Sequence, residues 1–130
     1  DKVVVFGYHR EAMIALHEAL KRAGIVATLI FGDTPRDMRD IRIEKWKRDG
    51  QVLIASTIIA STALDFTAAH QGIALEMDWV PGNNSQAFQR MHRYGQEYGV
   101  TVRVAMGTPI DELVSGVLLS KTRALAEVFD

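Results

Sequence analysis

The sequence predicts an α/β domain whose mainly parallel sheet has about five or six strands, with helices on both faces. Short apolar runs rich in Val and Ile alternate with longer amphipathic segments along the 130 residues. This alternation is typical of parallel strands joined by crossover helices. The length is that of one domain, and a 48% hydrophobic and 24% charged composition is ordinary for a soluble globular protein. We therefore expect residues 1–130 to form a single domain, excised from a longer protein.

The expected strands are short and apolar on both sides, as strands buried on both faces of a sheet are. By residue number they are 3–8, 25–31, 51–55, 72–77 and 100–105. The Ser-, Thr- and Ala-rich segment 56–70 has no clear period, and we interpret it as a loop with a short helix.

Helix start and stop signals separate these strands. A helix over 9–23 is expected to end at Gly24. In the next helix Thr34 is expected to be the cap and Pro35 the first residue, and Gly50 ends it.

The last two expected helices follow the fourth and fifth strands. Residues 81–85 are predicted to be a loop, with Asn84 or Ser85 capping a helix that begins at Gln86. A final helix is predicted to begin at Thr108 and Pro109 and to run almost to the end of the chain.

The composition and missing motifs exclude several functions. The formal net charge is −1, so a site for a polyanion has to be a local patch. There is no cysteine, which excludes disulfides and thiolate zinc sites. The chain contains neither a phosphate-binding G-x-x-x-x-G-K-[ST] motif nor G-x-G-x-x-G after the first strand. The histidines lack metal-ligand spacing, so no metal site is expected.

A polar stripe in the second half of the chain suggests where such a patch lies. In a helix beginning at Gln86, the side chains of Gln86, Gln89, Arg90 and Arg93 share one face. Guanidinium groups bind phosphate oxygens in a planar, bidentate manner. The stripe follows the fourth strand, and ligands of parallel sheets bind at the carboxyl ends of strands. The alternative is an ordinary solvated helix face.

These residues resemble a known motif set. The pattern Gln86-Ala-x-x-Arg90-x-His-Arg93-x-Gly-Gln96 closely resembles helicase motif VI of the Swi/Snf-type DNA-dependent ATPases of superfamily 2. In matching order, residues 3–11 look like motif IV, 32–39 like motif IVa, and 56–69 like motif V. Residues 78–82 resemble the aromatic-proline element that precedes motif VI. The match covers essentially the whole chain.

The resemblance implies that the chain is the C-terminal, second RecA-like lobe of a double-stranded DNA translocase from a bacterium or phage. The implied cofactor is ATP with Mg²⁺, bound mainly by a first lobe that the chain lacks. The implied partners are double-stranded DNA and that N-terminal lobe of the same protein, in a cytoplasmic monomer without membrane contact. The isolated lobe is expected to be inactive as an ATPase.

The resemblance also implies residue roles. Arg90 and Arg93 would be arginine fingers that reach the γ-phosphate of ATP. Asp65 would accept a hydrogen bond from the ribose, or alternatively cap its loop, and Gln86 would contact the nucleotide, or merely cap and pack. Ser56 or Thr57 would donate to a DNA phosphate.

One departure from the family pattern supports a different class of function. Motif V usually carries glycines where this chain has Ala60, Ser61 and Ala63, and side chains narrow the range of backbone conformations there. The alternative is a free-standing, non-catalytic RecA-like module that docks protein or nucleic acid.

Overall fold

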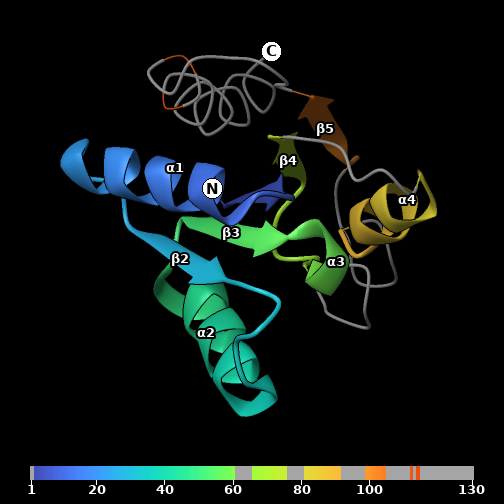
Figure 1. Cartoon of the computed structure of the whole chain (residues 1–130), viewed down its shortest axis with the longest axis horizontal. Helices are drawn as coiled ribbons and strands as arrows, with labels where there is room; N and C mark the ends of the chain where they lie inside the picture. The colour runs from blue at the N-terminus through green and yellow to red at the C-terminus, as the bar shows by residue number, and fades with distance from the viewer. Residues whose placement is uncertain are drawn as a thin grey trace.

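The structure, a computed structural model, describes residues 2–60, 66–75, 81–91 and 99–104, together with Glu112 and Val114. Its centre is a five-stranded sheet in the order β2-β3-β1-β4-β5, and all neighbouring strands are parallel (Figure 1). The strands are β1 Val3–Gly7, β2 Ala27–Ile30, β3 Val52–Ser56, β4 Gln71–Ala74 and β5 Thr101–Val104. The helices are α1 Arg10–Arg22, α2 Arg36–Asp49, α3 Thr57–Ala60 and α4 Pro81–Gln89. The predicted fold class is confirmed.

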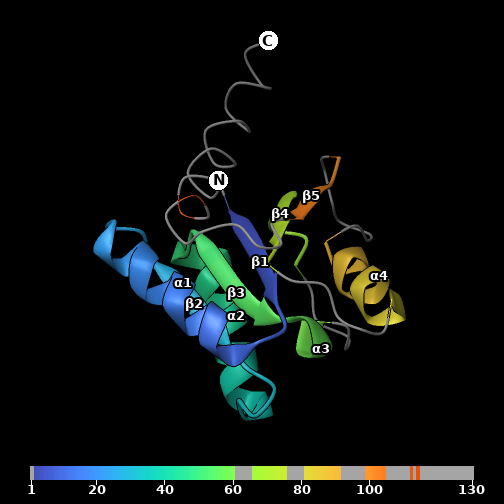
Figure 2. The same ribbon diagram turned by 45° about the horizontal axis from the view of Figure 1, so that its top comes forward.

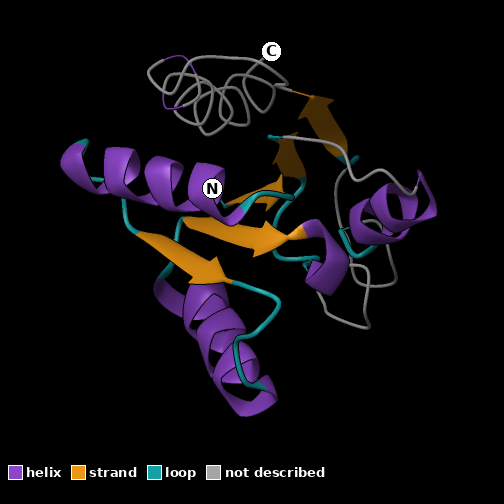
Figure 3. Cartoon of the chain, viewed as in Figure 1, coloured by secondary structure: helices purple, strands orange, loops and turns teal. Residues whose placement is uncertain are grey.

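Helices cover both faces of this sheet (Figure 2 and Figure 3). Successive strand side chains point to opposite faces, so β1 contributes to two separate cores. Val3 and Val5 pack with Met13 and Leu16 of α1. On the other face, the core residues from the helices α2, α3 and α4 include Ile43, Trp46, Ile59, Ala60 and Ala87. The result is a three-layer arrangement of helices, sheet and helices.

Gly24 ends α1 as predicted, and the hydrogen bonds explain why. Its φ of 78° lies in the left-handed region, which glycine adopts without steric cost. The Gly24 amide donates to the Lys21 carbonyl at 3.1 Å, and the Ile25 amide donates to the Leu20 carbonyl at 2.9 Å. This pair of bonds is the Schellman arrangement, which satisfies carbonyls that the helix leaves without partners.

Two predicted helix starts were wrong. Pro35 is the N-cap of α2 and no side chain caps the helix. Thr34 lies one residue earlier, where its Oγ1 accepts a hydrogen bond from the Phe31 amide at 3.0 Å and so closes the loop after β2. The helix expected to begin at Gln86 begins at Pro81 instead. The helix therefore includes residues 81–85, for which the sequence predicts a loop. Proline at the first helical position is favourable, because its missing amide hydrogen needs no partner there.

Other predictions fall partly outside the described residues. The end of the fourth predicted strand, the region beyond Met91 in the predicted Gln86 helix, and nearly all of the last predicted helix lie there. Of the last helix, only Glu112 and Val114 are described. Among the described helices, none combines the length and apolar character that crossing a membrane requires.

Candidate functional site

The candidate site is the edge of the sheet at the carboxyl ends of the strands. There the connections that follow two neighbouring strands run to opposite faces of the sheet. Gly7 at the end of β1 pairs with Ser56 at the end of β3. From these neighbouring positions β1 leads into α1 on one face and β3 leads into α3 on the other. In open parallel sheets, ligands bind in the crevice where adjacent connections diverge in this way.

The hydroxyl of Thr57 fastens these two strand ends together. Thr57 is 1% exposed, and its Oγ1 donates a hydrogen bond to the Gly7 carbonyl at 3.3 Å. Ser56 is also buried, with 9% exposure. The described geometry therefore gives the Thr57 hydroxyl a structural task between β1 and β3. The expectation that Ser56 or Thr57 contacts DNA stays a prediction.

Gln86 and Arg90 lie at the C-terminal half of α4 and just beyond it. Gln86 is exposed on the helix. Arg90 follows Gln89, the last residue of α4, and is half-buried, with its Nε shielded from solvent. Arg90 therefore occupies the turn that ends the helix, and not the helix interior that the predicted stripe assumed. Arg93 and Asp65 lie outside the described residues.

A backbone hydrogen bond joins the segment after α3 to the segment after α4. The Phe66 amide donates to the Arg90 carbonyl at 3.0 Å. Helices α3 and α4 also lie side by side, as the views in Figures 1 and 2 agree. Two stretches that are far apart in the sequence, 56–69 and 86–96, thus meet at one side of the sheet through their described residues.

The sequence reasoning missed a charged cluster at the same edge. Arg10, the first residue of α1, donates to both carboxylate oxygens of Asp33, from Nη1 at 3.0 Å and from Nη2 at 2.8 Å. Its guanidinium carbon also lies 4.2 Å from the ring centroid of Phe31. The hydrogen bond from Arg10, reinforced by its charge, lowers the pKa of the Asp33 carboxyl. The sequence did offer a signal for this pair, since two opposite charges follow the first two strands, Arg10 after the first and Asp33 after the second.

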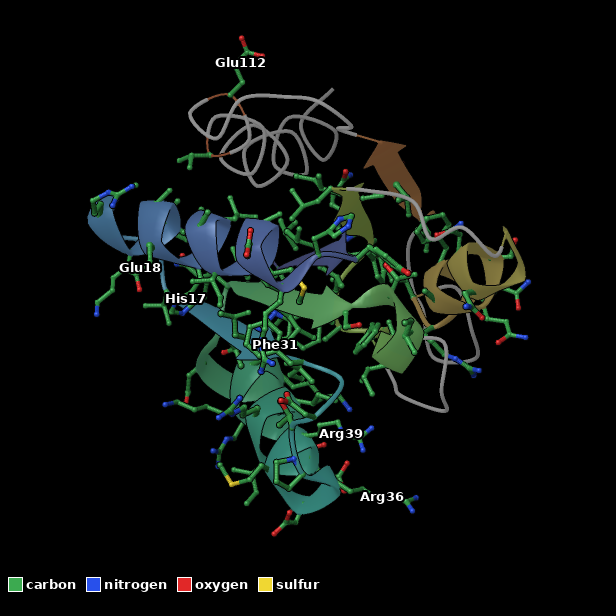
Figure 4. The ribbon with its side chains drawn as sticks, in the orientation of Figure 1. His17, Glu18, Phe31, Arg36, Arg39 and Glu112 are labelled. Carbon is green, nitrogen blue, oxygen red and sulfur yellow. The ribbon has the colours of Figure 1, made fainter. Side chains whose placement is uncertain are left out.

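Two further basic side chains lie on the neighbouring helix α2. Arg36 and Arg39 extend from the first turns of α2 on the same side of that helix (Figure 4). The Nε of Arg39 donates to the Thr34 carbonyl at 3.0 Å, which fixes the base of its guanidinium on the loop after β2. No group of three or more His, Asp or Glu side chains suitable for a metal ion occurs in the described part of the chain.

The strand order, the two helical layers and the meeting of these segments define a RecA-like helicase lobe. Solved structures show the same fold. The C-terminal part of the Fun30 ATPase domain superposes with a TM-score of 0.77 at 22% identity, covering 90% of this chain and 39% of that one. The C-terminal domain of the DEAD-box protein Dbp5 has a TM-score of 0.67 at 17% identity, covering 89% and 67%. The model of the helicase conserved C-terminal domain matches residues 1–95, and the chain belongs to this family.

Curated relatives support the Swi/Snf-type resemblance. A SWI/SNF-related matrix-associated actin-dependent regulator of chromatin subfamily A-like protein 1 of Drosophila melanogaster is 27% identical over 130 residues. The DNA annealing helicase and endonuclease ZRANB3 of Bos taurus is 32% identical over 126 residues. The matches cover 98% and 94% of this chain but only 17% and 12% of the two relatives. The chain thus corresponds to a small part of these longer proteins.

Proposed function

We propose that this chain is the second motor lobe of an ATP-dependent translocase of double-stranded DNA, from a bacterium or phage and working in the cytoplasm. In this proposal a first RecA-like lobe of the same protein binds most of the ATP and Mg²⁺. The observation that carries it is the hydrogen bond from the Phe66 amide to the Arg90 carbonyl at 3.0 Å. That bond joins the segment resembling motif V to the one resembling motif VI, which supports a role in which the two segments act together.

The residues of the chain suit a supporting role toward ATP. The sequence has no phosphate-binding loop, and its described residues include no carboxylate cluster for Mg²⁺. Arginine, by contrast, is the residue that stabilises charge on a phosphoryl group from across a cleft. When bound, ATP supplies the phosphoryl group that is transferred to water. Arg90 and Arg93 would hold its oxygens by paired N–H donors, and Gln86 and Asp65 would orient the nucleotide.

The fingers are tested in the protein that contains this lobe together with its first lobe. Arg90→Ala and Arg93→Ala should each lower ATP turnover by about 10³- to 10⁵-fold while ATP binding is largely retained. Arg48→Ala, which removes an exposed arginine in the last turn of α2, is the matched control and should leave turnover unchanged. Near-normal turnover in both finger variants would refute the assignment.

DNA binding is tested by salt titration. If basic side chains of this lobe contact DNA phosphates, the logarithm of the binding constant should fall linearly with the logarithm of the salt concentration. A binding constant that does not respond to salt would remove these ionic contacts from the proposal. The hydroxyls of Ser56 and Thr57 are neutral and release no counterions, so Ser56→Ala and Thr57→Val test them at one salt concentration, where weaker DNA binding is expected.

The alternative is a free-standing module that docks protein or nucleic acid without catalysis. Reading the gene upstream of Asp1 distinguishes the two, because a phosphate-binding loop and an Asp-Glu motif there favour the translocase. An unrelated domain or a stop codon favours the module. The isolated chain is expected to hydrolyse no ATP, and turnover by the chain alone would contradict the two-lobe proposal.

A further inference from the structure

The backbone of Arg90 is held from outside its own helix. Its amide donates to the Ala87 carbonyl at 3.1 Å, and the Met91 amide donates to the Phe88 carbonyl at 3.1 Å. Both bonds reach back three residues and tighten the chain as α4 ends. The last carbonyls of a helix have no partner within it. For Arg90 that partner is the Phe66 amide, at 3.0 Å.

Phe66 is itself fixed by a row of buried rings. Its ring centroid lies 6.4 Å from that of Trp46 on α2 and 6.2 Å from that of Phe6 on β1. Phe6 in turn lies 5.2 Å from Phe88 on α4, with its ring nearly edge-on. Trp46, Phe6 and Phe66 are fully buried. Close-packed interiors transmit displacement and do not absorb it, so the row joins α2, β1 and α4 as one rigid unit.

Arg90 is thus linked to Phe66 twice. One link is the direct hydrogen bond between the two backbones. The other runs through Phe6 to Phe88, two residues before Arg90. A shift of Phe66 therefore changes the direction in which the Arg90 side chain leaves the backbone, and the length of that side chain magnifies the change at the guanidinium.

We infer that Phe66 is a positioning residue for Arg90. In this inference the backbone amide of Phe66 orients the Arg90 guanidinium toward the transferred phosphoryl group. This inference rests on the proposed function, since it assumes that Arg90 acts on ATP.

The sharpest test removes the amide donor and keeps the ring. In the protein containing both lobes, Phe66→phenyllactate replaces the backbone N–H with an ester oxygen. Misplacing a catalytic group by about 1 Å can cost about 100-fold in rate, so we expect kcat to fall by about 10- to 100-fold. The KM for ATP should change by less than about twofold, because the defect concerns the transition state and not ground-state binding.

The matched control is the corresponding ester at Ile25. The Ile25 amide donates to the Leu20 carbonyl at 2.9 Å, and Ile25 is 6% exposed in the core on the opposite face of the sheet, so this ester deletes a similar buried bond that involves neither Phe66 nor Arg90. Both esters should lower Tm comparably, and only the ester at 66 should lower kcat. Equal kcat values in the two ester variants would overturn the inference.

A double variant separates this inference from the proposed function. If Phe66 acts through Arg90, the ester at 66 should not further slow the residual single-turnover rate of Arg90→Ala. A further loss of the same size would place the action of Phe66 elsewhere and overturn the inference. Normal turnover in Arg90→Ala would instead refute the finger role of Arg90, and the inference with it.

A second variant covers the case in which the ester protein does not fold. Phe66→Leu retains the amide and loses the ring, which loosens the aromatic row around the hydrogen bond. We expect a lower kcat at unchanged KM for ATP in this variant also. An unchanged kcat in Phe66→Leu would count against the positioning role.

Discussion

Thr57 donates a hydrogen bond from its hydroxyl to the Gly7 carbonyl at 3.3 Å, and so joins the carboxyl ends of β1 and β3. The two residues are 50 positions apart in the sequence. The bond lies where the connections after the two strands diverge to opposite faces. The bond therefore stabilises the edge of the sheet at which the candidate site lies.

Removing this hydroxyl should destabilise the domain. Thr57→Val keeps the shape of the buried side chain and leaves the Gly7 carbonyl without its donor, which should lower the free energy of unfolding by about 1 kcal/mol. The measurement is chemical denaturation of the isolated chain. Thr101→Val, at an exposed position on β5, should change the stability by less than about 0.5 kcal/mol. Equal stability of Thr57→Val and wild type would contradict a structural role for the bond.

The Arg10–Asp33 pair should make the loop after β2 sensitive to acid. The hydrogen bond from Arg10 lowers the pKa of Asp33 below its usual 3.8. Because the folded-state pKa is the lower one, the stabilisation is present above the unfolded pKa and is lost as the pH falls through the folded pKa. The pair is more than half exposed, at 55% and 67%, so the effect on global stability is small.

An NMR titration of the Asp33 carboxyl measures its pKa directly. In Arg10→Gln the pKa of Asp33 should rise toward its usual value, because both the hydrogen bond and the charge are weakened or removed. High salt should raise the pKa in the wild-type protein in the same direction. The same Asp33 pKa in both proteins would show that Arg10 does not hold the carboxylate.

Two glycines should respond in opposite ways to alanine. Gly24 has a φ of 78°, so Gly24→Ala forces a side chain into the left-handed region, although no atom lies within 4 Å of the new Cβ. We expect a loss of about 1–2 kcal/mol. Gly82 lies within α4 and a Cβ there also meets nothing within 4 Å. Gly82→Ala should stabilise the domain by about 0.5–1 kcal/mol. Thermal and urea unfolding of both variants checks the contrast, and a loss in Gly82→Ala would indicate that α4 does not begin at Pro81.

Gln71 is a buried polar residue whose replacement should stabilise the domain. It is 2% exposed on β4, and within the described part of the chain its Oε1 accepts no hydrogen bond. An unsatisfied buried acceptor costs about 1–3 kcal/mol, so Gln71→Met should raise the free energy of unfolding by about 1 kcal/mol or more. Gln89→Met makes the same change at an exposed position and should have little effect. A less stable Gln71→Met would show that the amide has a partner or a packing role.

The errors at helix starts have a common physical cause. At α2, Thr34 and Pro35 match a capping pattern, yet the Thr34 hydroxyl accepts a hydrogen bond from the Phe31 amide. At α4, the Gly-Asn-Asn run after Pro81 resembles a loop in composition, yet Asn84 is 6% exposed within the helix. Local propensity is weak, and tertiary contacts decide which of several allowed starts a helix adopts.

The sequence by itself determined the α/β class, the alternation of strands and helices, and the segments that resemble helicase motifs. These features follow from local hydrophobic periodicity and from residue types, which are readable along the chain. Only the tertiary structure decided three hydrogen bonds: from the Thr57 hydroxyl to the Gly7 carbonyl at the end of β1, from the Phe66 amide to the Arg90 carbonyl, and from the Arg10 guanidinium to the Asp33 carboxylate. Each of these contacts joins residues from different elements. Their geometry depends on strand order and register, which are set by the packing of the whole sheet.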